Sequence, residues 1–171
     1  VCCHNSRPRY RVWEGDFEGQ PIWAELLMKA GQRKEGCLSV AIKYEGRDFY
    51  QIIFWINKDT DGNEAMYIGA MQGPNTEKSR DVIKRMTKWA HGYRTKNLIL
   101  YMTQAVARAL GLKKIYAVSN YGYYANNHVR ADRKLKTNFG DFWLEAGGKE
   151  TEDKRFYELP LVEPRKTMEE V

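Results

Sequence analysis

The chain has 171 residues, the length of one ordinary domain, and 43% of them are hydrophobic, enough to bury a sizeable core. No run approaches the roughly 18 apolar residues of a membrane span, so this composition excludes a protein built from membrane-spanning helices. The net charge of +6 suits an anionic partner, either nucleic acid, anionic lipid or an anionic cofactor.

Cysteine usage and the start of the chain bear on metal binding and location. Cys2, Cys3 and Cys37 form an odd set without CxxC spacing, which is not the pattern of a disulfide framework. Cys2, Cys3 and His4 are neighbours whose side chains would seldom converge on one ion, so we predict no metal site. The first residues lack a signal-peptide pattern, and sparse thiols suit a reducing compartment. We therefore predict a cytoplasmic protein.

The first 34 residues carry the weakest pattern. Residues 1–20 show no period and predict an entry arm, with room for one short strand at Tyr10–Trp13. Ile22–Lys29 has the composition of a short helix, and Ala30-Gly31 would end it.

The next region predicts an antiparallel meander of three strands. Apolar residues alternate with small or polar ones, and β-branched and aromatic types are frequent. The turn at 59–63 lacks the ligand spacing of a calcium loop, so we interpret it as a hairpin turn. The predicted strands are 38–44, 49–56 and 65–71.

An amphipathic helix is predicted from Thr76 to His91, because apolar residues recur there on one face. Its other positions hold the densest basic cluster in the chain. That cluster is either a solvated outer face or a surface that binds anions or a partner. The basic residues are Lys78, Arg80, Lys84, Arg85 and Lys88.

A second helix is predicted after Tyr93, with Thr95 as its N-cap and Gly111 just beyond its end. Ile115–Val118 then predicts a short buried strand against which the helix packs. The residues expected to face inward are Leu98, Ile99, Met102, Val106 and Leu110.

The last third starts with a polar loop rich in tyrosine and asparagine after Ser119. Asp141–Ala146 predicts a short helix and Arg155–Leu161 a last strand. With no repeat and no linker, residues 1–171 predict a single α/β domain of the α+β kind. Its sheet would be mixed, mostly antiparallel and flanked by helices.

Several blocks of the chain resemble a known family. They are IGAMQGP at 68–74, the run at 83–120, FGDFWLEAGG at 139–148, and FYELPL with PRK at 156–166. Together they resemble the VirK/YbjX family, across roughly residues 35–171. The resemblance implies a bacterial protein linked to virulence and envelope robustness, and it brings no established reaction.

The order of predicted elements also resembles the C-terminal two-thirds of the GNAT acyltransferase fold. That resemblance implies that a helix N-terminus meets the cofactor pyrophosphate and that the next strand is splayed to admit the pantetheine arm. The corresponding corner here is Arg94, Thr95, Lys96 and Asn97, with acyl-CoA as donor. This sequence departs from the fold by lacking the Gly-rich loop and by inserting the helix at 76–91.

Acyl transfer to an amine needs a base for the nucleophile and an acid for the leaving thiolate. Tyr123 or Tyr124 could be the acid, Asn120 could orient a substrate amide, and Glu64 could be the base. Each has a plainer alternative, because loop tyrosines usually pack and a glutamate beside a hairpin turn is usually solvated.

Two functions follow. The first is a GNAT-like acyltransferase that uses acyl-CoA or another carrier-bound acyl or aminoacyl donor and an amine or hydroxyl acceptor. The second is a non-enzymatic adaptor, associated with the envelope or virulence, that docks a protein partner or an anionic membrane surface through the basic helix 76–91. Nucleic acid is not expected, because no helix-turn-helix, RNP or zinc-finger signature is present.

Overall fold

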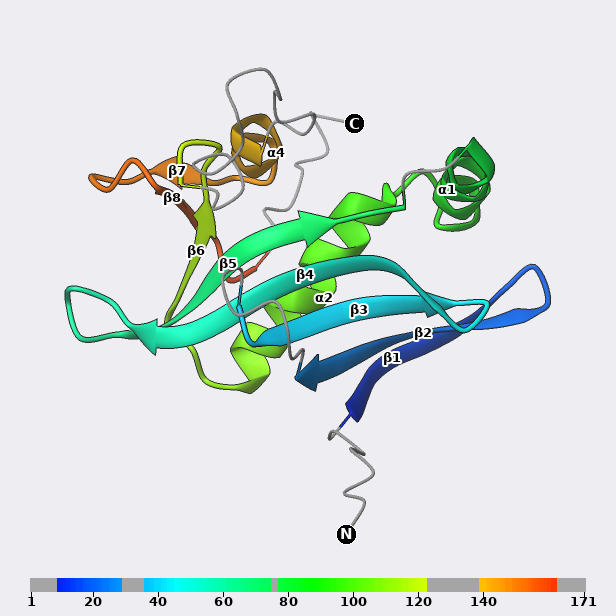
Figure 1. Cartoon of the computed structure of the whole chain (residues 1–171), viewed down its shortest axis with the longest axis horizontal. Helices are drawn as coiled ribbons and strands as arrows, with labels where there is room; N and C mark the ends of the chain where they lie inside the picture. Colours follow the sequence, from blue (N-terminus) through cyan, green and yellow to red (C-terminus); the bar gives the residue numbers. More distant parts are fainter. Residues whose placement is uncertain (1–8, 29–35, 75–76, 123–138, 163–171) are drawn as a thin grey trace, which may run out of the picture.

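An open sheet of eight strands, in the order β1-β2-β3-β4-β5-β6-β8-β7, forms the frame of the molecule (Figure 1). The computed structural model describes residues 9–28, 36–74, 77–122 and 139–162. β5 and β6 pair in parallel and all other neighbours are antiparallel, which confirms the predicted α+β class with a mixed, mostly antiparallel sheet. The strands are β1 Arg9–Phe17, β2 Gln20–Met28, β3 Leu38–Tyr44, β4 Arg47–Lys58, β5 Glu64–Gln72, β6 Lys114–Val118, β7 Lys149–Glu150 and β8 Phe156–Leu159.

The first two strands form a hairpin, so the helix predicted at 22–29 is wrong, and residues 9–20 are not an irregular arm. The short strand predicted at Tyr10–Trp13 lies within β1 and is confirmed. The segment IWAELLM is rich in helix formers, yet β2 pairs along its length with β3. Ile22 and Ala24 are fully buried while Trp23 between them is half-buried, which is the two-residue period of a strand. Tertiary pairing therefore overrides local helical propensity here.

Two hairpins turn on the same dipeptide. Glu18-Gly19 joins β1 to β2 and Glu45-Gly46 joins β3 to β4, and all four residues have positive φ. Positive φ at both central positions is the geometry of a two-residue hairpin turn whose twist matches that of the strands. The Glu-Gly dipeptide at both turns was a sequence signal for the β1–β2 hairpin. The helical propensity of residues 22–29 pointed to a helix instead.

The three-strand meander β3–β4–β5 is confirmed. Its second turn is organised by Asp59, whose Oδ1 accepts hydrogen bonds from the backbone N–H of Asp61 at 3.0 Å and of Asn63 at 2.9 Å. This arrangement is that of a hairpin turn, as predicted.

Three helices accompany the sheet within the described residues: α1 Glu77–Trp89, α2 Thr95–Ala109 and α4 Phe139–Glu145. α2 lies behind the sheet in Figure 1 and packs on β3 and β4. Ile99, Met102 and Val106 are buried in the core as predicted, and Leu98 is half-buried against it. α4 adds Phe139, Phe142 and Trp143 to the same core, and confirms the short helix expected there.

The end of α2 corrects one prediction. Leu110, expected to face inward, is the C-cap residue and is 47% exposed. Gly111 has a φ of 73° and ends the helix as expected, with its N–H bonded to the carbonyl of Arg108. The next N–H, from Leu112, bonds to the carbonyl of Ala107 at 3.0 Å, which completes a Schellman motif. Leu112, only 5% exposed, occupies the core position that Leu110 was expected to fill.

The sheet also positions the start of α2. β5 and β6 pair only from Ala65↔Lys114 to Ile68↔Ala117, whereas β5 continues to Gln72. The two strands diverge beyond this short ladder, as Figure 1 shows. α1 and then α2 follow from the free end of β5, so α2 begins near that end of the sheet and runs back across its face.

Candidate anion-binding site at the start of α2

The first turn of α2 presents backbone donors that lie outside the hydrogen-bond ladder of the helix. The first intrahelical bond runs from the N–H of Leu98 to the carbonyl of Arg94, so the amides of residues 95–97 precede the helical ladder. Arg94, with extended backbone angles, is the N-cap and makes no side-chain capping bond. No acidic residue stands in the first turn to satisfy the positive end of the helix dipole. The predicted N-cap role of Thr95 is therefore wrong, because Thr95 is the first helical residue and its side chain is buried.

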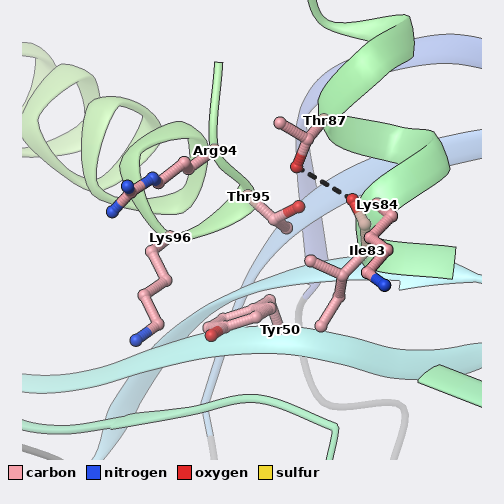
Figure 2. Close-up of a pocket in the computed structure, with 7 residues that line it drawn as sticks. All are labelled: Tyr50, Ile83, Lys84, Thr87, Arg94, Thr95 and Lys96. Atoms are coloured by element: carbon pink, nitrogen blue, oxygen red, sulfur yellow. Dashed lines mark hydrogen bonds between the residues drawn. The ribbon is translucent and has the colours of Figure 1, made fainter. Parts of the chain in front are cut away.

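A cavity of about 420 Å³ opens at this turn. Figure 2 shows Thr95, Ile83 and the Tyr50 ring around it, with Lys84 and Lys96 approaching from its two sides. No acidic side chain is among the lining residues. They are Tyr50 of β4, Ile83, Lys84 and Thr87 of α1, and Arg94, Thr95 and Lys96 at the start of α2.

The hydroxyl of Thr95 is the unusual group in this cavity. Thr95 is 2% exposed, and within the described part of the chain its Oγ1 has no hydrogen-bond partner. Thr87, on the opposite wall, donates its hydroxyl to the carbonyl of Ile83 at 2.8 Å and is satisfied. A buried hydroxyl without a partner costs free energy, so Thr95 is a group that a ligand could satisfy.

Tyr50 supplies the floor of the cavity. Burial raises the pKa of its phenol, so the hydroxyl stays protonated near neutral pH and can donate a hydrogen bond. The ring is held from behind by Gly73, where an added Cβ would lie 2.5 Å from it. Backbone amides, two hydroxyls and exposed cations in a cavity without carboxylates are the groups that bind phosphate.

The other residues predicted for the site do not gather at this cavity. Asn97 is half-buried and is not among the lining residues, and Tyr123 and Tyr124 lie outside the described residues. Glu64 begins β5, whereas the cavity lies beyond the end of that strand. The eight residue steps from Glu64 to Gln72 span about 26 Å of extended chain, too far for contact with a phosphate in the cavity.

Asn120 has a structural task. Its Oδ1 accepts a hydrogen bond at 2.9 Å from the backbone N–H of Phe139, the first residue of α4. A side-chain oxygen that satisfies a free N–H of a helix start is a cap, here supplied from 19 residues away in sequence. The carboxamide of Asn120 thereby ties the end of β6 to α4.

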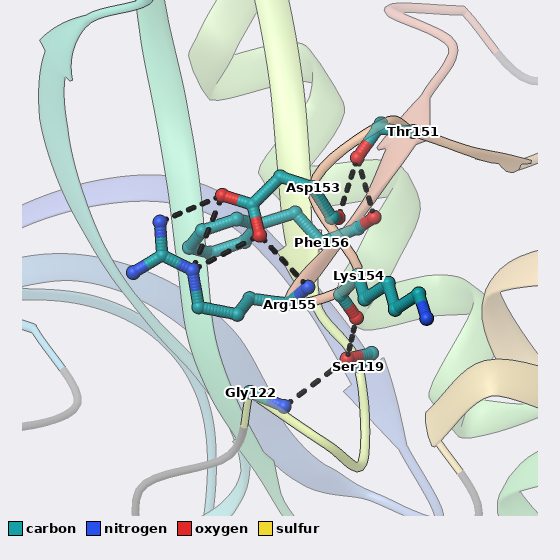
Figure 3. Close-up of polar contacts among 7 residues, drawn as sticks. All are labelled: Ser119, Gly122, Thr151, Asp153, Lys154, Arg155 and Phe156. Atoms are coloured by element: carbon teal, nitrogen blue, oxygen red, sulfur yellow. Dashed lines mark hydrogen bonds and ion pairs between the residues drawn. The ribbon is translucent and has the colours of Figure 1, made fainter.

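A polar cluster that the sequence did not reveal joins the end of β6 to the start of β8 (Figure 3). Ser119 donates its hydroxyl to the carbonyl of Lys154 at 2.6 Å, and the N–H of Gly122 donates to Ser119 at 3.1 Å. Arg155 forms a forked ion pair with Asp153, which holds the pKa of that carboxyl below its usual range. These contacts satisfy one another, and the cluster holds the two chain segments together.

A second feature that was missed lies beside this cluster, because Phe156 packs edge-on against Trp55 and Tyr67. Trp55, Tyr67 and Tyr116 stack across three neighbouring strands with ring centroids 5.3 and 5.2 Å apart. Tyr116 donates its hydroxyl to Asp59 at 3.0 Å. Burial, and then the neighbouring carboxylate, raise the pKa of Tyr116 far above its usual value, so it remains a protonated donor. This contact anchors the β4–β5 hairpin on β6.

No group of three or more histidine, cysteine, aspartate or glutamate side chains with metal-binding geometry occurs in the described ranges. Cys2, Cys3 and His4 lie outside those ranges, and Cys37 is exposed. Among the helices whose placement is described, none has the length and apolar character needed to cross a membrane.

The described residues thus define an α+β protein with a basic pocket at a helix N-terminus. The chain belongs to the family described as "Protein of unknown function (DUF535)", whose model matches residues 3–171. It is 29% identical over 156 residues to the "Uncharacterized protein YbjX" of Escherichia coli (strain K12), which covers 90% of this chain and 47% of that protein. The predicted membership of the VirK/YbjX family is thereby confirmed.

Two further relatives are bacterial as well. The chain is 34% identical over 105 residues to the "Membrane protein LapB" of Mannheimia haemolytica, which covers 60% of this chain and 42% of that protein. An "Uncharacterized protein" of Haemophilus influenzae is 29% identical over 98 residues, with 57% and 32% covered. The chain spans less than half the length of these curated relatives. No solved structure matches the chain.

Proposed function

We propose that this protein is a GNAT-like acyltransferase that binds a phosphate-bearing acyl donor, acyl-CoA or another carrier-bound acyl or aminoacyl group, at the start of α2. The observation that carries the proposal is the buried hydroxyl of Thr95, which has no hydrogen-bond partner in the described structure and lines the cavity. A phosphate oxygen at that point would accept its hydrogen bond together with those of the helix amides.

The charges around the cavity favour the same class of ligand. Lys84, Arg94 and Lys96 are exposed at the rim of the cavity. Their charged groups are solvated in the free protein, and each can turn toward an anion that binds there. Charge-assisted hydrogen bonds of this kind contribute about 1.5–3 kcal/mol each. A neutral ligand would leave these three cations and the dipole of α2 unmatched.

The path of an acyl arm is supported by the divergence of β5 from β6. Past Ile68 and Ala117 the parallel ladder ends, and the edge of β5 from residue 69 onward is no longer paired with β6. Among the described residues no strand pairs with that edge, and an unpaired strand edge suits an arm that carries amides, as pantetheine does. The inserted helix α1 and the missing Gly-rich loop distinguish this chain from the GNAT pattern.

The proposed step is acyl transfer from a thioester. The acceptor nitrogen or oxygen attacks the thioester carbonyl, the carbon–sulfur bond breaks, and the proton lost by the acceptor ends on the departing thiolate. Tyr123 and Tyr124 remain the candidate acids for that proton, and no base is assigned, because Glu64 lies at the other end of β5. A cytoplasmic location, where such donors are made, stays a prediction.

Calorimetry with CoA, acetyl-CoA and a long-chain acyl-CoA at low salt tests the proposal. Arg94→Ala and Thr95→Val should each weaken donor binding about tenfold, which corresponds to about 1.4 kcal/mol. Added salt should weaken it further, because part of the attraction is screened. Lys113→Ala, an exposed residue beyond the far end of α2, is the matched control and should leave binding unchanged. No heat at millimolar ligand and low salt would refute donor binding.

A second function is favoured by the outward face of α1. Lys78, Arg80, Lys84 and Lys88 are exposed, as predicted, and none of them forms an ion pair within the described structure. A non-enzymatic adaptor could dock an acidic partner or an anionic membrane surface through them. One relative is named a membrane protein, and this name favours the membrane alternative for this chain.

A further inference from the structure

The outward face of α1 carries more basic than acidic side chains, because four exposed cations share the helix with two exposed carboxylates, Glu77 and Asp81. We define the α1 basic face as Lys78, Arg80, Lys84 and Lys88. Arg80, Lys84 and Lys88 follow one another at i, i+4 spacing, so they form a stripe of like charges on one side of the helix. Like charges at that spacing destabilise a helix by roughly 0.2–0.5 kcal/mol per pair. Glu77 and Asp81, three residues before Arg80 and Lys84, offset part of this repulsion, and the face keeps a net positive charge that an anionic surface would match.

The contacts by which α1 packs on the sheet leave the α1 basic face toward solvent. Met86 is 1% exposed, and Trp89 packs edge-on against Phe17 with ring centroids 5.7 Å apart. Arg85, the fifth basic residue of the helix, is ion-paired with Glu18 in the β1–β2 turn. Apolar contacts and this ion pair hold one side of α1 against the sheet, and the basic face occupies the other.

The α1 basic face is continuous with the anion-binding cavity. Lys84 belongs to both, because it lies in the stripe and also lines the cavity beside Thr95 (Figure 2). Arg80 and Lys88 stand one turn to either side of it, and eight residues of helix separate their Cα atoms by about 12 Å. A phosphate held at Thr95 would satisfy Lys84 and leave Arg80 and Lys88 exposed to solvent. The stripe therefore calls for several anionic groups on a body larger than one phosphate.

A protein surface fits this face better than a membrane does. Helices that lie in a membrane interface insert large apolar side chains beside their cations. Among the described residues, the exposed large apolar side chains include none on α1, whose apolar residues face the core. An acidic helix could instead lie along α1 and match its spaced charges.

We propose that the acyl donor reaches this site attached to an acidic carrier protein. The acidic surface of the carrier docks on the α1 basic face, and the phosphate that links its acyl arm enters the cavity at Thr95. The proposal rests on the proposed function and specifies its donor. Transfer follows the same balance: the acyl group leaves the arm's sulfur for the acceptor, and the carrier departs as its free thiol with the acceptor's proton.

The test compares two donors against two kinds of variant. The probes are a bacterial acyl carrier protein in its apo, holo and acylated forms, and the acyl-CoA of the same chain length, measured by calorimetry at low salt. Arg80→Glu combined with Lys88→Glu should weaken binding of the acylated carrier about tenfold or more and weaken acyl-CoA binding by a much smaller factor, because only the carrier contacts these two residues. Thr95→Val should weaken both donors, because both place a phosphate at the same hydroxyl. The apo carrier, which lacks the arm, should bind more weakly than the holo form.

Lys113→Glu combined with Lys149→Glu is the matched control. It makes the same change in net charge at exposed positions away from α1, and it should leave carrier affinity unchanged. Thermal unfolding of both double variants verifies that any loss reflects docking and not misfolding.

The possible results separate the two proposals. Acyl-CoA binding without carrier binding would overturn the carrier inference and leave the proposed function intact. If neither donor binds, both proposals fall. Equal weakening by the control pair would show general charge attraction and would also overturn docking on α1. Anionic vesicles of phosphatidylglycerol and phosphatidylcholine form the last arm. Binding to them that is lost in the Arg80/Lys88 variant, without carrier binding, would assign the face to a membrane.

Discussion

Thr95 and Thr103 are buried threonines of the same helix with opposite hydrogen-bond status. Thr103 donates its hydroxyl to the carbonyl of Ile99 at 2.8 Å, whereas Thr95 has no partner among the described residues. Thr103→Val should lower the free energy of unfolding by about 1 kcal/mol, because a satisfied hydrogen bond is lost. Thr95→Val should be neutral or stabilising, because only an unsatisfied hydroxyl is removed. Urea unfolding of the two variants measures the difference, and a larger loss for Thr95→Val would show that its hydroxyl is already bonded in the free protein.

Asp59 links stability to pH. Partial burial acts to raise its pKa, but hydrogen bonds from the N–H of Asn63, the hydroxyl of Tyr116 and the N–H of Asp61 outweigh it, so the net shift is downward. A carboxyl whose folded pKa lies below its unfolded value of about 4 stabilises the fold above that value. This stabilisation is lost as the pH falls through the folded pKa.

We therefore expect the free energy of unfolding to fall as the pH drops from the unfolded value of about 4 through the folded pKa, and Asp59→Asn to flatten that fall. Asparagine keeps an acceptor oxygen at the site but cannot titrate there. Urea unfolding at each pH measures the effect, with Asp61→Asn, an exposed neighbour in the same turn, as the control. An unchanged pH profile in Asp59→Asn would show that Asp59 titrates alike in the folded and unfolded chains.

At the scale of elements, the end of α2 decides which leucine enters the core. Leu112→Ala should cost about 2–5 kcal/mol, because Leu112 is 5% exposed and its removal leaves a cavity. Leu110→Ala, at 47% exposure, should change stability by about 0.5 kcal/mol or less. Chemical denaturation of the pair tests the Schellman ending directly. A large cost for Leu110→Ala would mean that the helix continues past residue 109 and turns Leu110 inward.

The whole sheet behaves, in our expectation, as one cooperative unit that includes its first hairpin. Phe17 and Ile22 are fully buried, and they share one core cluster with Trp143 near the other edge of the sheet. Deleting residues 1–28 should therefore abolish the cooperative thermal transition, and Phe17→Ala should lower the stability by about 3–5 kcal/mol. Circular dichroism monitors both. A truncated chain that still melts cooperatively near the temperature of the full chain would restore the view of these residues as a dispensable arm.

The elements that could be predicted are those whose pattern is complete within a short stretch. Helix α2 has a continuous apolar face and a glycine at its end, and β3, β4 and β5 alternate with turn residues between them. β7 has two residues and no pattern of its own, and β8 is shorter than the predicted strand, because pairing with β6 sets its length. The basic residues of α1 were expected either to be solvated or to dock a partner, and the structure confirms their exposure.

The sequence by itself determined the α+β class, the meander, the two long helices and the family, since each of these is encoded in local periodicity or in ordered blocks of residues. Only the tertiary structure decided that IWAELLM is a strand, because its pairing with β3 outweighs a helical propensity of a few tenths of a kcal/mol per residue. Tertiary structure also decided the site. Arg94 to Asn97 were expected to form an anion corner, but the partners Tyr50 and Lys84 come from other elements, and Glu64 is carried to the far end of β5. Proximity across elements depends on how the sheet is ordered and how α1 packs on it, and no local pattern contains that information.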